Sequence, residues 1–152
     1  MQIEVRGLER LQARLERMAE ADLERALAVI GQGLVEEVER EFEAERDPYG
    51  TPWKPLAPAT LERRRKRGAG AKILQDTGVM RRSLNWQLRG RHAVAVGFAD
   101  KKAAWHQQGT KDGRLPARPL LPWKGGPGGV DLPRRWWRVI KETLEGLYGE
   151  PA

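Results

Sequence analysis

The fold depends on one stretch of the chain, Asp47-Pro48-Tyr49-Gly50-Thr51-Pro52-Trp53-Lys54-Pro55-Leu56. No helix can run through it, because Pro48, Pro52 and Pro55 each lack a backbone N–H and restrict the residue before them. Pro48 and Gly50 are typical of a tight turn, which leads the chain to Trp53. No catalytic chemistry needs this arrangement. We expect a rigid loop anchored by the burial of Trp53, which favours a role in assembly over one in turnover.

Before this loop, apolar residues recur at the spacing of a helix face. The first set is Leu8, Leu11, Leu15 and Met18, and the second is Leu23, Leu27, Ile30, Leu34, Val38 and Phe42. Because the second set is in a new phase, the pattern predicts either two helices or one long helix with a bend, and Asp22 is placed to cap the second. Gly31 and Gly33 weaken this helix by about 1 kcal/mol each relative to alanine, and they also permit close packing.

The charges of the chain are unevenly distributed. Residues 1–50 contain 7 Lys+Arg and 13 Asp+Glu, whereas residues 51–124 contain 17 Lys+Arg and 4 Asp+Glu. This asymmetry indicates a polyanionic partner, charge pairing between subunits, or only a solvated basic surface. The acidic face of the second helix is either its wet side or a docking surface for a basic neighbour; it carries Glu36, Glu37, Glu39, Glu41, Glu43 and Glu45.

The part of the chain after the loop is predicted to alternate short helices and strands. Residues 59–67 favour a helix with Pro58 in its first turn. Alternating apolar residues over 84–88 and 93–98, separated by a turn at Gly90-Arg91, predict an antiparallel hairpin. Residues 103–109 form either a short helix or an extended segment that ends at a glycine. A last helix is expected from about residue 132 to about residue 147.

These elements predict an α+β fold, with a long N-terminal helix, a small antiparallel sheet and a C-terminal helix. A chain of 152 residues suits one domain. We expect it to comprise an acidic helical region at 1–46, a basic loop and sheet region at 47–124 and the C-terminal helix at 130–148. The glycine-rich stretch at 125–129 lacks the Lys-Ser/Thr ending of a phosphate-binding loop and is expected to be flexible.

Composition argues against several kinds of site. The chain has no cysteine and only two histidines, so we expect no disulfide, metal site or cofactor. His106 lies beside Trp105 without a nucleophile motif, which favours a structural or interfacial role over a catalytic one. There is no apolar run near 18 residues, and the N-terminus lacks the order of a signal peptide, so we expect synthesis in the cytoplasm and no membrane partner.

A basic run follows the proline-rich loop, formed by Arg63, Arg64, Arg65, Lys66 and Arg67. Arginine and lysine contacts to phosphate give sequence-independent binding to nucleic acid. The run is either a solvated helix face or a contact for DNA or an acidic partner. No known nucleic-acid-binding module fits the chain.

Five motifs in one order resemble the phage virion morphogenesis family, which includes the Mu-type tail completion proteins. They are Pro48-Tyr49-Gly50-Thr51-Pro52-Trp53; Ile73-Leu74 with Thr77-Gly78 and Ser83-Leu84; Val96-Gly97; His106-Gln107 with Gly109; and Pro116-Ala117-Arg118-Pro119. The resemblance covers roughly residues 1–123. The chain departs from the family's pattern at Trp105, which directly adjoins His106, and at the glycine-rich stretch near 125–129.

The resemblance implies a structural, non-enzymatic protein that completes a phage tail or joins tail to head. Such proteins resemble tail terminator and neck proteins, which assemble as rings, often hexameric. The implied partners are further copies of the chain, tail tube or head–neck proteins, and packaged DNA, and the implied location is the tail end or neck of the virion. The alternatives are a basic DNA-binding module and an assembly chaperone absent from the mature particle.

The implied structural and interface residues belong to the motifs: Pro48, Gly50, Trp53, Thr77, Gly78, His106, Gly109, Pro116, Arg118 and Pro119. We expect Arg118 to form an ion pair between subunits. In a ring, the acidic helix face of one subunit would meet the basic region of the next, a heterologous contact that closes by rotation. Whether Trp53 closes its own core or inserts into the next subunit stays open at this stage.

Overall fold

The computed structural model describes residues 13, 23–126 and 129–149. The first predicted apolar stripe, over Leu8–Met18, and the capping residue Asp22 lie outside these residues. The described elements are α2 (Leu23–Ala44), α3 (Pro58–Lys66), α4 (Val79–Arg82), β1 (Leu84–Arg89), β2 (Ala93–Phe98), α5 (Lys102–Gln108), β3 (Gly125–Gly126), β4 (Gly129–Val130) and α6 (Arg134–Tyr148). Long first and last helices with a small antiparallel sheet confirm the predicted α+β class.

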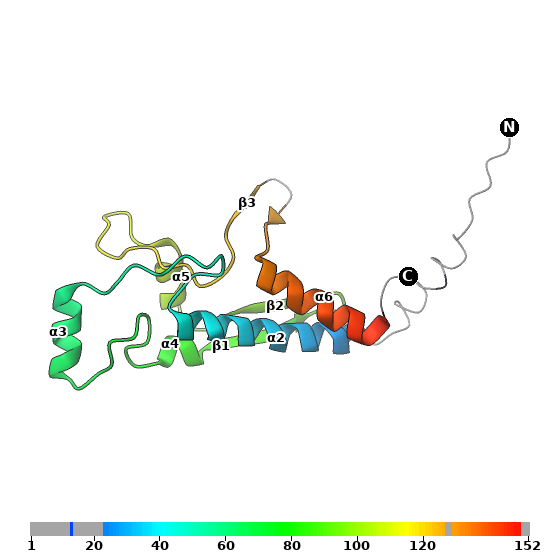
Figure 1. The fold of residues 1–152 in the computed structure, drawn as a ribbon, viewed down its shortest axis with the longest axis horizontal. Coiled ribbons are helices and arrows are strands. Elements are labelled where there is room, and N and C mark those ends of the chain that lie inside the picture. The colour runs from blue at the N-terminus through cyan, green and yellow to red at the C-terminus, as the bar shows by residue number, and fades with distance from the viewer. Residues whose placement is uncertain (1–12, 14–22, 127–128, 150–152) are drawn as a thin grey trace.

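Helix α2 is the centre of the molecule and packs against both the β1–β2 hairpin and α6 (Figure 1). Two glycines make this close packing possible. A Cβ atom at Gly31 would lie 2.8 Å from Val94 Cγ2, and one at Gly33 would lie 2.6 Å from Val139 Cγ1. Both distances are too short for a real side chain, so the predicted use of these glycines in packing is confirmed.

The hairpin forms as its alternating pattern predicts. Strands β1 and β2 pair antiparallel in a register that runs from Leu84 opposite Phe98 to Arg89 opposite Ala93. Trp86 lies opposite Val96 and donates a hydrogen bond from its indole nitrogen to Gln32 Oε1 of α2, at 3.2 Å. Among the described residues, these two strands make up the whole sheet, and the glycine-rich β3 and β4 form a separate small ladder.

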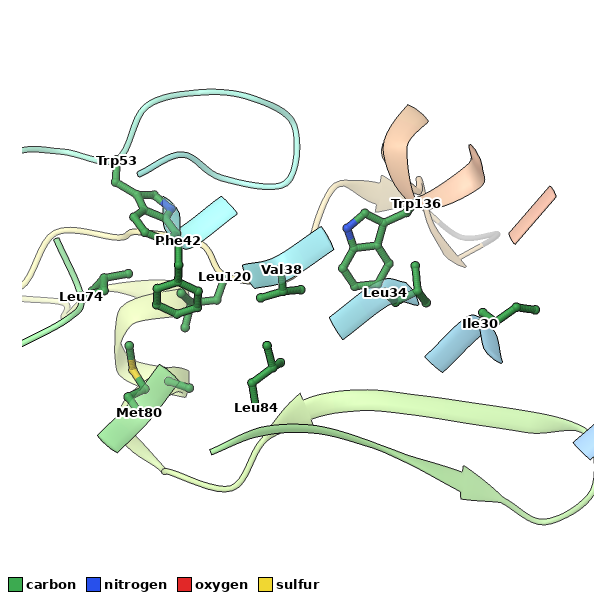
Figure 2. Close-up of a cluster of buried hydrophobic side chains, with 11 residues drawn as sticks. Ile30, Leu34, Val38, Phe42, Trp53, Leu74, Met80, Leu84, Leu120 and Trp136 are labelled. Atoms are coloured by element: carbon green, nitrogen blue, oxygen red, sulfur yellow. The ribbon is translucent and has the colours of Figure 1, made fainter. Parts of the chain in front are cut away.

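The core lies on the apolar face of α2 (Figure 2). Residues at every fourth position, Ile30, Leu34, Val38 and Phe42, are all buried, as helical spacing requires. Trp136 of α6 lies on one side of this helix, and Leu84 of β1 lies on the other (Figure 2). The remaining members come from loops and short helices: Trp53, Leu74, Met80, Ala103 and Leu120.

The C-terminal part differs from its prediction in two details. The stretch at 125–129, expected to be a flexible loop, contributes to the β3–β4 ladder. Helix α6 begins at Arg134, slightly after the expected start near residue 132, because Pro133 is extended at φ −60° and ψ 152° and occupies the N-cap. No helix of the described residues is long and apolar enough to cross a bilayer.

Candidate functional site

The turn before Trp53 is held by Asp47, a residue that the sequence analysis did not single out. Its Oδ1 accepts hydrogen bonds from the backbone N–H groups of Tyr49, at 2.8 Å, and Thr51, at 3.0 Å. Gly50 has φ 92°, a conformation that glycine adopts without strain, and its N–H donates to Asp47 O at 2.9 Å. An aspartate just before Pro-x-Gly is a known turn former, so the signal was present in the sequence.

Trp53 inserts into the core of its own chain. Its side chain is only 4% exposed, and its ring meets that of Phe42 edge-on at a centroid distance of 5.4 Å. The indole Nε1 donates a hydrogen bond to Pro119 O at 2.8 Å. The aromatic loop and the Pro-Ala-Arg-Pro segment are therefore joined directly, although more than sixty residues separate them.

Arg118 joins the same segments from the other side. Its guanidinium donates from Nε to Lys54 O at 2.7 Å and from Nη2 to Pro55 O at 2.9 Å, and its backbone N–H donates to His106 O at 2.7 Å. The residue is 4% exposed. Within its own chain the buried guanidinium binds carbonyls, and the expected ion pair with a neighbouring subunit stays a prediction.

Helix α5 completes this structure, which we call the motif frame: residues 47–55, 102–109 and 115–121. Gln107 Oε1 accepts from the N–H groups of Leu120, at 2.8 Å, and Leu121, at 3.0 Å. Gly109 ends α5 at φ 72°, where a Cβ atom would lie 2.7 Å from Ala117 N. Gln107 lies in the His-Gln motif but was not predicted as a site residue, because its partners are distant in sequence.

A hollow of about 350 Å³ opens beside the motif frame, between α3, the start of α4, α5 and the loop before Arg118. We call it the cationic hollow, because five cations but only Asp76 and Asp100 as acids line it; the cations are Arg63, Arg64, Lys102, Arg114 and Arg118. Several predicted site residues meet here: Thr77, Gly78, His106, Pro116, Arg118, Arg63 and Arg64. The others, Pro48, Gly50, Trp53, Gly109 and Pro119, do not line this hollow.

His106 is half-buried where the frame meets the hollow. Burial, and then the charge of Arg118, lower the pKa of its imidazole, which favours the neutral ring. Its Nδ1 is buried without a hydrogen-bond partner in the described part of the chain. Within residues 13, 23–126 and 129–149, no cluster of His, Cys, Asp or Glu is arranged to hold a metal ion.

The predicted basic run does not form one continuous surface. Arg64 is 7% exposed and donates from Nη1 to Gly70 O at 3.2 Å and Lys72 O at 2.7 Å. Three neighbours pair with carboxylates on the surface. Arg65 lies 3.0 Å and Lys66 3.9 Å from Glu62, and Arg67 lies 3.0 Å from Asp76. Of the run, only Arg63 and Arg64 line the cationic hollow.

The acidic face of α2 is used largely within the chain. Arg81 of α4 donates from Nε to Glu39 Oε2 at 2.6 Å and from Nη2 to Glu43. Glu45 Oε1 accepts from Ile73 N at 2.6 Å. Glu37 and Glu41 are buried. Residues of the basic region of the same chain therefore already meet part of this face, and docking of another subunit on it stays a prediction.

Comparison with known proteins bears on these motifs as a set. Residues 3–136 match the model of the phage virion morphogenesis family. Neither the curated proteins nor the solved structures gave a match. The family match spans the whole motif frame, the cationic hollow and α2, and it supports a virion-associated role in assembly. The chain, with most of its length inside this match, belongs to the phage virion morphogenesis family.

Proposed function

We propose that the protein is a structural component that completes the phage tail or joins it to the head, as a ring at the tail end or neck. Membership of the virion morphogenesis family supports a role in assembly. The motif residues support a structural role, because they hold chain segments together through buried hydrogen bonds instead of presenting reactive groups. A rigid subunit of this kind suits a particle in which many identical contacts must form with the same geometry.

The observation that carries this proposal is that the described fold leaves large aromatic side chains and strand edges exposed. Trp105 is 52% exposed and Trp137 is 54% exposed, on two different helices. Each strand of the two-stranded sheet has one edge that no other described strand covers. Large exposed aromatics and free sheet edges are typical of surfaces that bind other chains. Separate patches on different elements suit the head-to-tail contacts from which rings are built.

The alternative of a basic DNA-binding module has less support. Its strongest basis was the run from Arg63 to Arg67, in which three cations pair with surface carboxylates and Arg64 is buried. The second alternative, an assembly chaperone absent from the mature particle, is distinguished by where the protein is found and not by its fold.

Purified particles provide the test. We expect mass spectrometry to find the protein in mature particles, and electron microscopy to place it as a ring at the tail end or the neck. Trp105→Ala and Trp137→Ala are expected to leave the monomer folded but to yield unjoined heads and tails or tails of abnormal end structure. Trp105 and Trp137 variants that assemble normally would exclude these patches as contacts. A protein required for assembly but missing from mature particles would favour the chaperone.

A further inference from the structure

We infer that the cationic hollow receives a carboxylate-bearing peptide segment of another protein of the particle. This inference rests on the proposed function for the identity of the partner, but its physical basis is the charge of the hollow itself. Arg63, Lys102 and Arg114 present exposed cations at its wall, of which Arg114 also lies 3.3 Å from Asp112 on the surface, and Arg64 and Arg118 are buried in the lining.

The chain leaves the charges of the two buried arginines incompletely neutralised. The guanidinium groups of Arg64 and Arg118 donate mainly to backbone carbonyls, which supply partial charge but no anion. Among the described residues, Arg118 forms no ion pair, and Arg64 Nε lies 3.8 Å from Asp76 Oδ1, a carboxylate that Arg67 approaches at 3.0 Å. Burial, and then the charge of Arg64, lower the pKa of Arg118, as expected for a desolvated cation near a second cation. Burial of uncompensated like charges is unfavourable, and an incoming anion relieves it.

Two buried nitrogen atoms in the lining lack partners. Arg64 Nε and His106 Nδ1 are both shielded from solvent and make no hydrogen bond in the described part of the chain. Buried polar groups are nearly always satisfied in a native assembly, and exceptions indicate a missing partner. An arginine N–H with no acceptor, beside further guanidinium groups, is suited to a carboxylate, which accepts several charge-assisted hydrogen bonds at once.

The shape and apolar lining favour a peptide over DNA. Leu56, Leu74, Met80 and Leu115 line the hollow between the cations. A peptide that alternates acidic and apolar side chains would satisfy both kinds of lining group, as ligands of concave protein sites do. Duplex DNA presents its phosphates on a convex surface, where a row of exposed cations serves better than an enclosed space.

The experiment measures the affinity of the purified full chain for a blocked peptide, Glu-Leu-Glu-Glu-Leu-Glu, by calorimetry. A peptide with glutamine at each glutamate position controls for apolar contact. The test variant Arg63→Gln/Lys102→Gln/Arg114→Gln removes exposed cations from the hollow, and the matched control Arg65→Gln/Lys66→Gln/Arg89→Gln removes three exposed cations elsewhere. Thermal unfolding of both variants verifies that they fold.

We expect the glutamate peptide to bind the natural protein, to bind the test variant at least tenfold more weakly, and to bind the control within about twofold. The glutamine peptide should bind at least tenfold more weakly than the glutamate peptide. No binding, or equal losses in the two variants, would overturn the inference. Duplex DNA that displaces the peptide and binds more tightly through the same three cations would overturn the peptide assignment. If the protein is found in particles but its hollow does not bind the peptide, only this inference fails. If the hollow binds the peptide but the protein is absent from mature particles, only the proposed structural role fails.

Discussion

Replacement of Glu41 by glutamine is expected to stabilise the protein at neutral pH. Glu41 lies on α2, is 4% exposed, and accepts a hydrogen bond from Trp136 Nε1 on Oε1 at 3.2 Å. Its Oε2 is buried without a partner in the described residues. Burial, opposed in part by the Trp136 hydrogen bond, raises the pKa of the carboxyl from 4.5 to about 8, and Glu37 and Asp47 add to the shift. The folded protein therefore keeps Glu41 protonated at pH 7.

The size of the effect follows from proton linkage. Between pH 4.5 and about 8, the unfolded chain releases the Glu41 proton and the folded chain retains it. Stability must therefore fall as pH rises through this window, by about 1.4 kcal/mol per pH unit. At pH 7 the accumulated cost is about 3 kcal/mol. Glutamine avoids this cost and still offers Trp136 an acceptor oxygen, so Glu41→Gln should raise the free energy of unfolding by about that amount.

Urea unfolding from pH 4 to pH 9 measures this prediction, with the free energy extrapolated to water at each pH. The gain from Glu41→Gln should be near zero at pH 4 and should grow up to about pH 8. Glu142→Gln, an exposed change on α6, is the matched control and should leave the pH profile unaltered. A Glu41→Gln variant with the natural pH profile, or one less stable at pH 7, would show that the carboxyl is ionised in the fold and would refute the reasoning.

Three further changes test the packing and the ion pairs. Trp53→Phe keeps an aromatic ring in the core but leaves Pro119 O without its donor. It should lower the free energy of unfolding in urea by about 1–2 kcal/mol, against about 3–5 kcal/mol for Trp53→Ala, and equal losses would mean that the hydrogen bond dominates. Gly31→Ala should lower stability by about 1–3 kcal/mol despite the better helix propensity of alanine, because its methyl meets the hairpin, and a raised melting temperature would contradict the packing. Arg81→Gln should cost about 1 kcal/mol in low salt and less in 1 M salt, and a cost unaffected by salt would show that its pairs with Glu39 and Glu43 contribute through packing instead.

The sequence was sufficient to predict the elements whose cause is local. Ile30, Leu34 and Val38 are four residues apart, and this spacing defines the buried face of α2. The alternation of apolar and polar residues around Trp86 defines the hairpin. The prolines around Trp53 made a helix there impossible, and no helix forms. Each of these inferences needs only neighbours within a few residues, where backbone geometry leaves few choices.

The partners of long polar side chains could not be predicted in the same way. Arg118 was expected to meet a carboxylate of another subunit, and it binds the carbonyls of Lys54 and Pro55, 64 and 63 residues away in its own chain. Arg81 was not expected to pair within the chain, but it donates to two glutamates of α2, a helix whose acidic face was considered as a docking surface for a neighbour. Residue type specifies charge and reach, but only the packing of whole elements decides which group lies within hydrogen-bond distance.

Most residues that hold the motif frame together differ from the exposed residues of the cationic hollow that would contact a partner. Trp53, Gln107 and Pro119 are committed to one another or to nearby backbone, so their presence specifies the fold and says little about the partner. Lys102 and Arg114 are exposed at the hollow, lie outside the five motifs, and make no contact on which the core depends. A protein with the same frame but acidic residues at these two positions should therefore fold in the same way and reject a carboxylate-bearing partner. Arg118 serves both purposes, because its guanidinium holds the frame through two carbonyls while its charge contributes to the hollow.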